Sequence, residues 1–203
     1  MTKLSFFIPN FNGGGAENSA CELANEFAKN NIDTEIITLI DKGPTKKILS
    51  STINIKSLNT KKMILSLFKF SNYVKKSNPN FIITNLNHSS FIALISKKLF
   101  KLNYKIVITF VNKINLNLNP KNLINLLYVL LIRILIDKNT KIVTITEGIK
   151  KDLIKFWRFE SKMITVIYPP TNIENINYLK NIKNNDNLFN NKKNKYILTV
   201  GRL

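Results

Sequence analysis

The stretch FFIPNFNGGGAENSACELANEF, residues 6–27, decides the fold of this chain. It begins with a short apolar, aromatic run typical of a buried strand, and three consecutive glycines follow shortly after it. From Ala16 onward apolar residues recur every three or four positions, and Glu17 lies in the first turn, where a carboxylate suits the helix dipole. A strand, a glycine turn and a helix are therefore predicted. The backbone between strand and helix must turn sharply, approach a ligand closely, or both.

The same alternation of apolar strands and amphipathic helices continues along the chain. Further strands are predicted at 34–40, 53–58, 81–87, 105–111, 141–146 and 163–168, and helices at 61–77, 90–100, 123–136 and 147–156. Strands that alternate with helices are typical of right-handed crossovers and of a parallel sheet covered by helices on both faces. The predicted fold class is therefore α/β, with a Rossmann-like doubly wound parallel sheet.

In such a sheet, ligands bind beyond the carboxyl ends of the strands. The segments that fall at these ends are the glycine turn, Asn87-His88, Val111-Asn112 and Thr146-Glu147. We therefore expect the functional site at this edge, with residues 13–17 as one of its walls.

The glycine turn suits a phosphate group, because a helix start offers unpaired N–H groups and the positive end of the helix dipole. A dinucleotide site would need three spaced glycines and an acid after the second strand. Gly13, Gly15 and Asp41 fit this pattern, but Asn18 replaces the third glycine, and no Gly-Lys-Ser/Thr follows. Two interpretations stay open: a phosphate site, and a tight turn whose glycines serve only the backbone.

The predicted domain organisation has three parts. Residues 1–171 form an N-terminal Rossmann-like domain, residues 172–195 form a polar linker rich in Asn and Lys, and residues 196–203 form the first strand of a further domain. A single strand cannot bury its own faces, so the sequence is predicted to be cut short at Leu203.

Composition sets the class of protein. With 203 residues, 44% of them hydrophobic, the chain can bury a substantial core. The N-terminus shows no cleavage site for a secretory signal, so we expect a cytoplasmic protein. Cys21 is the single cysteine, which excludes an internal disulfide and a multi-cysteine metal site, and it is expected to pack on the first helix.

The chain carries 31 Lys and Arg against 12 Asp and Glu, a net charge of +19. Because lysines recur along the whole chain with many asparagines and isoleucines, we interpret the excess as thinly spread. Two interpretations of this excess positive charge stay open: a biased amino-acid composition, or a surface that is attracted to an anionic membrane. A nucleic-acid partner is not expected, because no recognisable nucleic-acid-binding module is present.

The apolar run INLLYVLLIRILI, residues 124–136, requires a membrane test. It is 13 residues long and contains Arg133, whereas a spanning helix needs roughly 20 apolar residues. It is therefore not predicted to cross a membrane. It is either a buried packing helix or an interfacial helix with Lys121, Lys138 and Lys141 near its ends.

The ordered set of motifs IPNFNGGGAENSACELANEF, KIVTITEGIKKDLI, ITVIYPPTNIENI and ILTVGRL resembles the amino-terminal half of family-4 glycosyltransferases of the GT-B fold. The resemblance runs from about Leu4 to Leu203. It implies that this chain is the acceptor-side domain of two that face each other across a cleft, the second binding a nucleotide-diphospho-sugar donor. It implies no cofactor beyond that co-substrate, and no metal.

The resemblance also implies roles for particular residues. Those near the donor diphosphate or the acceptor are Gly14, Gly15, Ala16, Glu17 and Arg202. Those facing the acceptor cleft are His88, Asn112, Thr146 and Glu147. Val111 stands where many members of the family carry a histidine. The lysine and paired glutamates that hold the donor sugar have no counterpart, so this chain alone is expected to be inactive.

Three functions from different classes follow. The first is a glycosyltransferase of cell-envelope polysaccharide or lipopolysaccharide synthesis, cytoplasmic and located at the inner face of the plasma membrane. It would transfer a sugar to a glycan or lipid-linked acceptor. The second is a non-catalytic basic domain that binds anionic membrane or glycan. The third is a nucleic-acid binder.

Overall fold

The computed structural model describes residues 2–114, 120–170 and 173–182. The chain divides into two compact units, residues 1–170 and residues 171–203. The first unit contains the sheet and the candidate site. In the second, the described residues form helix α6, Ile173–Lys180.

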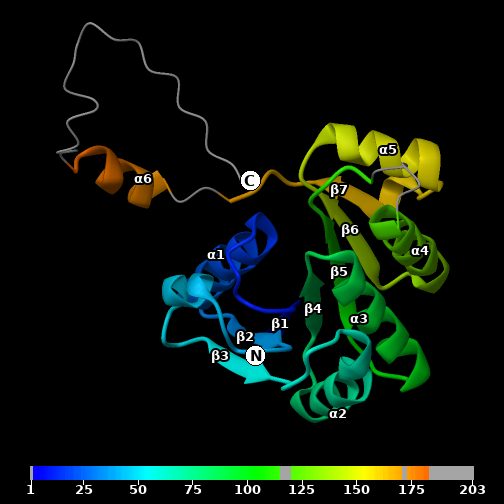
Figure 1. The fold of residues 1–203 in the computed structure, drawn as a ribbon, viewed down its shortest axis with the longest axis horizontal. Helices are drawn as coiled ribbons and strands as arrows, with labels where there is room; N and C mark the ends of the chain where they lie inside the picture. The colour runs from blue at the N-terminus through cyan, green and yellow to red at the C-terminus, as the bar shows by residue number, and fades with distance from the viewer. Residues whose placement is uncertain (1, 115–119, 171–172, 183–203) are drawn as a thin grey trace, which may run out of the picture. The chain divides into compact units, whose positions relative to one another are not determined.

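Strands and helices alternate along the first unit as the sequence predicts (Figure 1). Its strands are β1 Lys3–Ile8, β2 Asp33–Thr38, β3 Asn54–Ser57, β4 Phe81–Thr84, β5 Lys105–Phe110, β6 Thr140–Thr144 and β7 Ile164–Val166. Its α-helices are α1 Gly15–Lys29, α2 Leu67–Ser77, α3 Asn87–Leu99, α4 Pro120–Leu135 and α5 Glu147–Trp157. Three short 3₁₀ helices are η1 Pro44–Ile48, η2 Ile64–Ser66 and η3 Ser161–Met163.

The seven strands form one sheet in the order β3-β2-β1-β4-β5-β6-β7, and every neighbouring pair is parallel. In the register of the two central strands, Leu4 of β1 lies opposite Phe81 of β4. This topology confirms the α/β, Rossmann-like doubly wound sheet. It also places every strand's carboxyl end at the same edge.

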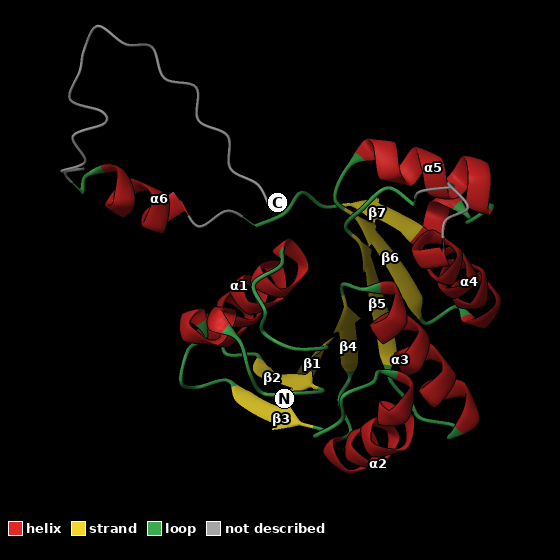
Figure 2. Ribbon diagram, in the orientation of Figure 1, coloured by secondary structure: helices red, strands yellow, loops and turns green. Residues whose placement is uncertain are grey.

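The helices divide unequally between the two faces of the sheet (Figure 2). On one face, α1 packs Ala20, Cys21 and Ala24 against Phe6 and its neighbours on β1. On the other face, α2, α3, α4 and α5 cover the inward side chains of the strands from β2 to β7. Right-handed crossovers that extend the sheet in opposite directions place their helices on opposite faces, so the four later helices share one face.

Helices thus lie on both faces of the sheet, as predicted, but in the described part of the chain the α1 face is covered only in part. On the α1 face, the described residues leave an apolar groove of about 480 Å³ over β4, β5 and β6. Phe81, Val107 and Val143 from these strands line its floor, and Leu23 and Phe27 of α1 form part of its wall. The alternation of strands and helices along the sequence predicts how many helices there are, but it does not predict on which face of the sheet each helix packs.

Cys21 is fully buried on α1, which confirms its predicted packing role. Burial raises the pKa of its thiol to about 12, with a smaller contribution from the carboxylates of Glu17 and Glu22. A thiol with this pKa stays protonated near neutral pH, so Cys21 behaves as a small apolar side chain.

A buried carboxylate ties three elements together. Glu35 on β2 is 2% exposed, and it accepts hydrogen bonds from the Ser5 hydroxyl of β1 at 2.6 Å and from the Tyr73 hydroxyl of α2 at 2.7 Å. Lys3 forms an ion pair with it at 3.0 Å. Because each of its partners is itself part of the fold, Glu35 serves the sheet and not the site.

Two boundaries differ from the sequence prediction in ways that affect the site. The strand predicted at 81–87 ends at Thr84, and the helix predicted from residue 90 begins at Asn87. His88 therefore lies in the first turn of α3. The range predicted as a linker contains helix α6, and the strand predicted at 196–203 lies outside the described residues.

Candidate functional site

The candidate site lies where the sheet changes direction. β1 and β4 are neighbours in the sheet, but the chain leaves β1 toward α1 on one face and leaves β4 toward α3 on the other. The divergence of two such connections opens a crevice outside the carboxyl ends of the strands. Residues 13–17 lie at this edge, which confirms the position expected from the sequence.

The three glycines of the turn have different local roles. Gly13 has φ +87°, a conformation that a residue with a side chain rarely adopts. A Cβ at Gly14 would collide with the carboxylate of Glu17, which folds back over this residue. Gly15 is the first residue of α1, and nothing lies within 4 Å of the position of its missing Cβ. The turn requires Gly13, whereas the space beside Gly15 is open.

The start of α1 presents its backbone to this space. Gly14 occupies the N-cap position, and no side chain caps the helix. The first N–H groups of a helix have no acceptor within the helix, and the dipole adds a partial positive charge there. The geometry can therefore accept an anionic or strongly polar group close to Gly15.

His88 lies across the crevice on the first turn of α3. Burial lowers the pKa of its imidazole, and the carboxylate of Glu17 partly opposes this effect. The ring lies 6.4 Å from the ring of Tyr128 on α4, measured between centroids. Near neutral pH the imidazole is therefore uncharged, with one nitrogen that donates and one that accepts a hydrogen bond.

A cavity of about 340 Å³ opens beside His88, between the carboxyl ends of β4 and β5. Its polar lining consists of Asn85, Asn87, His88, Thr109, Asn112, Lys113 and Asn125. Amides, a hydroxyl and a neutral imidazole both donate and accept hydrogen bonds, as recognition of hydroxyl groups requires. The structure thus brings together two predicted residues, His88 and Asn112, in a lining suited to a polyol.

Asn85 joins the two walls of the crevice. Its side chain is 3% exposed, and its Nδ2 donates a hydrogen bond of 3.1 Å to the carbonyl oxygen of Ala16. Within the described residues, its Oδ1 has no hydrogen-bond partner. Asn85 therefore fixes the start of α1 against the end of β4, and its buried Oδ1 is an unpartnered acceptor next to the cavity.

Thr146 and Glu147 lie at the carboxyl end of β6, as predicted, but they do not line the cavity beside His88. The Thr146 hydroxyl caps α5 by accepting a hydrogen bond of 3.2 Å from the N–H of Ile149. Both residues are exposed. Arg202 lies outside the described residues.

Sequence reasoning placed Asn87 at this edge without a role, and it missed Asn85, Lys113 and Asn125. The run Thr84 to His88 carried a usable signal, because two asparagines directly follow a buried strand at the active edge of a parallel sheet. Asn125 carried no such signal, since it lies inside the helical apolar run. Val111 lines the cavity, so an apolar side chain stands at that position.

Metal-ligating side chains do not gather at this edge. In residues 2–114, 120–170 and 173–182, no three His, Cys, Asp or Glu side chains lie close enough to hold a metal ion. The same part of the chain contains no helix long and apolar enough to cross a bilayer.

We expect the pKa of His88 to lie below 6.5 in the folded chain, and stability to depend on it. Because the pKa of His88 is lowered on folding, the unfolded chain binds this proton more readily. Stability is therefore fully present above about pH 6.5 and decreases as the pH falls from there toward the folded pKa. His88 is the single histidine, so one imidazole signal in an NMR titration reports it directly.

Two variants test the cause of this shift. Glu17→Gln removes the charge that favours the imidazolium, so the midpoint should move further down, whereas Glu22→Gln on the same helix should leave it in place. A midpoint at or above 6.5, or equal effects of the two variants, would contradict this electrostatic description of the crevice.

The parallel sheet, its order and the cavity at its carboxyl edge define a Rossmann-like domain, and solved GT-B glycosyltransferases share its fold. The sequence model of Glycosyltransferase Family 4 matches residues 13–175. This chain belongs to glycosyltransferase family 4. No curated protein sequence matches it significantly.

Three solved structures illustrate the likeness in fold. A glycosyltransferase from Rickettsia africae has a TM-score of 0.64 and 19% identity over 90% of this chain and 46% of its own. The lipopolysaccharide outer core galactosyltransferase WaaB has a TM-score of 0.61 and 17% identity over 84% and 46%. Anabaena HepE in complex with UDP-glucose has a TM-score of 0.67 and 14% identity over 86% and 45%. This chain thus spans about half the length of the solved structures it matches.

Proposed function

We propose that this chain is the acceptor-side part of a glycosyltransferase that transfers a sugar from a nucleotide-diphospho-sugar to a glycan or lipid-linked acceptor in cell-envelope polysaccharide synthesis. The observation that carries the proposal is that an uncapped helix start with open space at Gly15 and a polar cavity beside His88 both lie at the carboxyl edge of the sheet. Family membership supports the reaction class. The named relatives, a lipopolysaccharide galactosyltransferase and a protein bound to UDP-glucose, support the substrate class.

In this proposal, the residues that bind the donor have roles that follow from their chemistry. The backbone N–H groups from Gly14 to Glu17 face the donor diphosphate or the acceptor, and Arg202 contacts the donor phosphates. In the transfer, the bond from the anomeric carbon to the diphosphate breaks and a bond to an acceptor oxygen forms. Preorganised N–H groups and cations stabilise the negative charge that develops on the departing diphosphate.

The cavity beside His88 serves the acceptor in this proposal. His88 and Asn112 hydrogen-bond acceptor hydroxyls, while Thr146 and Glu147 form a more distant wall of the same edge. Because the imidazole of His88 is neutral near pH 7, it can accept a proton or a hydrogen bond from a hydroxyl. The transfer needs no cofactor or metal beyond the nucleotide sugar.

The test is a transfer assay on the polypeptide made from its complete reading frame, with any sequence that follows Leu203 included. Radiolabelled UDP-, ADP-, GDP- and TDP-sugars are supplied with lipid-linked glycans and free oligosaccharides, with and without EDTA. The proposal predicts a labelled glycan and a stoichiometric nucleoside diphosphate, in equal yield with EDTA. Hydrolysis or epimerisation of the donor without any labelled glycan would overturn it.

A non-catalytic role in binding an anionic surface is the second candidate. The distribution of charge favours it, since residues 61–163 hold 19 Lys and Arg against 4 Asp and Glu. We do not propose a nucleic-acid partner. The two roles are compatible, because a lipid-linked acceptor lies in a membrane, and a location at the inner face of the plasma membrane would serve both.

A further inference from the structure

Helix α4 is apolar on two opposite sides. Val129 and Ile132 are fully buried against the sheet. On the outer side, the exposed apolar residues are Leu123, Leu127, Leu130 and Ile134, each between 45% and 63% exposed. Their spacing of four, three and four residues places them in one stripe along the helix. A surface helix of a soluble domain usually has one apolar side, so the outer stripe needs an explanation.

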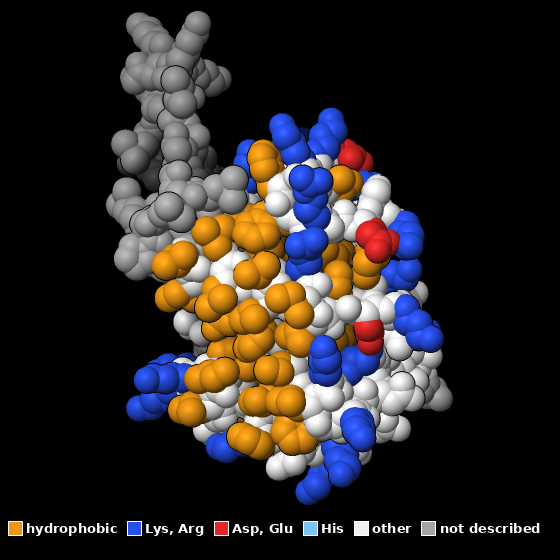
Figure 3. Space-filling model, turned by 90° about the vertical axis from the view of Figure 1, so that its right-hand side faces the viewer, with side chains coloured by type: hydrophobic (Ala, Val, Ile, Leu, Met, Phe, Trp, Pro, Cys, Tyr) orange, Lys and Arg blue, Asp and Glu red, His pale blue; other side chains and the backbone are white. Residues whose placement is uncertain are grey.

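The outer stripe of α4 continues onto the neighbouring helices. Leu99 and Phe100 at the end of α3 are exposed, and so is Phe68 on α2. The rings of Phe68 and Phe100 make an edge contact, with 5.9 Å between their centroids. Figure 3 looks onto this side and shows hydrophobic side chains gathered in one continuous area. We call the set Phe68, Leu99, Phe100, Leu123, Leu127, Leu130 and Ile134 the apolar band.

The positive charge of the chain is concentrated in the segment that carries the apolar band. Residues 1–60 carry six Lys and Arg and six Asp and Glu, a net charge of zero, whereas residues 61–163 have a net charge of +15. The interpretation of a thinly spread charge is therefore wrong. The helices that cover the face with the apolar band, α2, α3, α4 and α5, all belong to this positively charged segment.

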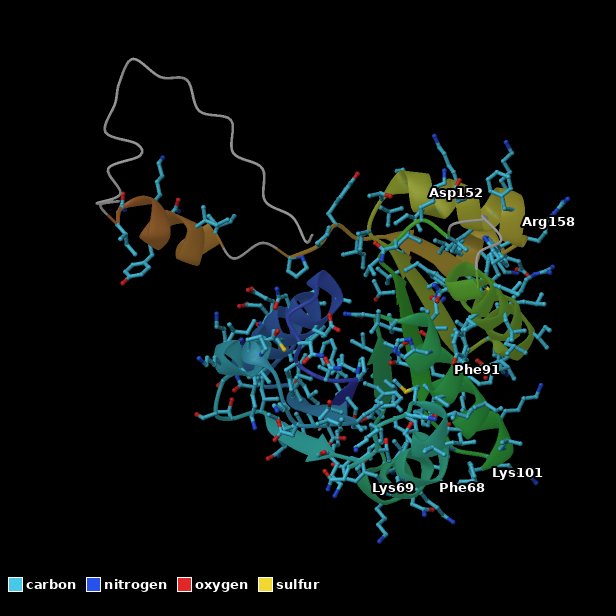
Figure 4. All side chains as sticks on the ribbon, viewed as in Figure 1. Phe68, Lys69, Phe91, Lys101, Asp152 and Arg158 are labelled. Atoms are coloured by element: carbon cyan, nitrogen blue, oxygen red, sulfur yellow. The ribbon has the colours of Figure 1, made fainter. Side chains whose placement is uncertain are left out.

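Cations border the band at both ends. Lys98 and Lys101 flank Leu99 and Phe100 in the sequence, and Arg133 precedes Ile134. Figure 4 places Lys101 just after α3 and Arg158 just after α5, on the same side of the domain as α4. Figure 3 shows Lys and Arg side chains beside the hydrophobic area.

A basic groove of about 750 Å³ adjoins the end of α4. Its cations are Arg133, Lys138, Lys141, Arg158 and Lys162. Its two acids are already paired, Asp137 with Lys97 at 2.7 Å and Glu160 with Lys162 at 2.8 Å. Burial tends to raise the pKa of Asp137, but the hydrogen bonds from Lys97, Thr140 and Asn139, together with the charge of Lys97, lower it overall. The groove therefore keeps a strong positive potential suited to phosphate groups.

We propose that the α2–α5 face docks on an anionic lipid bilayer, with the apolar band at the boundary between headgroups and acyl chains and the bordering cations on lipid phosphates. An amphipathic surface with a cationic rim binds a membrane in this way through buried apolar area and attraction to anionic lipid together. A second copy of the chain is a poor occupant, because the cations beside the band would face the same cations of the other copy, and like charges repel. The proposal does not depend on the transfer activity.

The direct test measures sedimentation of the chain with vesicles of phosphatidylcholine alone and of phosphatidylcholine with phosphatidylglycerol. Binding should require phosphatidylglycerol and should weaken at high salt. The triple variant Leu127→Gln/Leu130→Gln/Ile134→Gln should bind the anionic vesicles at least about 10-fold more weakly. The control Ile40→Gln/Ile48→Gln changes residues that are 40% and 44% exposed in the neutral segment, and it should bind like the wild type.

A charge series separates the two contributions. Lys98→Gln/Lys101→Gln/Arg133→Gln should weaken binding by about 100-fold, since each cation near an anionic surface contributes several-fold. Lys42→Gln/Lys47→Gln removes two exposed cations from the neutral segment and should have little effect. Circular dichroism and thermal melting confirm that each variant is folded.

Three results would overturn the proposal. One is equal binding to vesicles without phosphatidylglycerol, and another is wild-type binding by the folded α4 variant. The third is a stable dimer in solution that the α4 substitutions convert to a monomer, which would assign the band to a second copy of the chain.

Discussion

Replacing Gly15 by valine is expected to reduce sugar transfer by at least about 100-fold while changing the free energy of unfolding by no more than about 1 to 2 kcal/mol. Gly15 begins α1 without a positive φ, and its missing Cβ points into open space, so the fold tolerates a side chain. The same open space is where the proposed donor or acceptor approaches the backbone. A valine would fill it. Transfer rate and melting temperature, measured on the same preparation of the complete polypeptide, separate the two effects.

Gly13→Val is the matched control two residues away. Its φ of +87° is strained for any residue with a Cβ, so this substitution should cost about 1 to 3 kcal/mol of stability. The two substitutions should therefore have different effects: Gly15→Val should reduce the transfer rate, whereas Gly13→Val should reduce the stability of the fold. Retained transfer by a folded Gly15→Val variant would show that the glycines serve the turn alone.

Replacing Gly43 by valine is expected to destabilise the first unit by more than about 3 kcal/mol. Gly43 has φ +135°, and a Cβ there would collide with the backbone of Phe11 and lie 2.7 Å from the N atom of Asn12. Backbone atoms cannot move aside as the end of a flexible side chain can. Urea denaturation followed by circular dichroism measures the loss.

The effect of Gly43 should extend to the site, because its loop braces the glycine turn. The N–H of Phe11 donates a hydrogen bond of 3.1 Å to the carbonyl oxygen of Lys42. The N–H of Thr45 donates one of 3.0 Å to the carbonyl oxygen of Phe11. Gly148→Ala is the control, since its Cβ would meet only the Thr146 hydroxyl at 3.7 Å. Equal stability of the Gly43 and Gly148 variants would contradict this account.

The sequence by itself determined the elements and the class of the fold. Apolar runs of strand length, apolar residues at helical spacing and the glycine turn are local signals, and each needs only a few neighbouring residues. The parallel sheet follows from their alternation. The same local signals predicted the burial of Cys21 and the position of residues 13–17 at the carboxyl edge, and both are confirmed.

The boundaries near the site were not determined locally. Asn87 and His88 have modest helix propensity, so the sequence pattern predicts the start of a helix three residues later than the observed first turn of α3. Tertiary contacts decide this boundary, because Asn85 is held by the carbonyl oxygen of Ala16, 69 positions away. Long-range hydrogen bonds of this kind leave no periodic trace in the sequence.

Only the tertiary structure decided which residues share the site and which face the helices cover. It brought His88 and Asn112 to one cavity, left Thr146 and Glu147 outside it, and distinguished the strained Gly13 from the open Gly15. It also exposed an apolar stripe on α4 that the sequence could not assign to core or surface, and placed basic residues beside it. The physical reason is the same in each case: periodicity along a chain reports which side of an element is apolar, whereas packing between distant elements decides what that side meets.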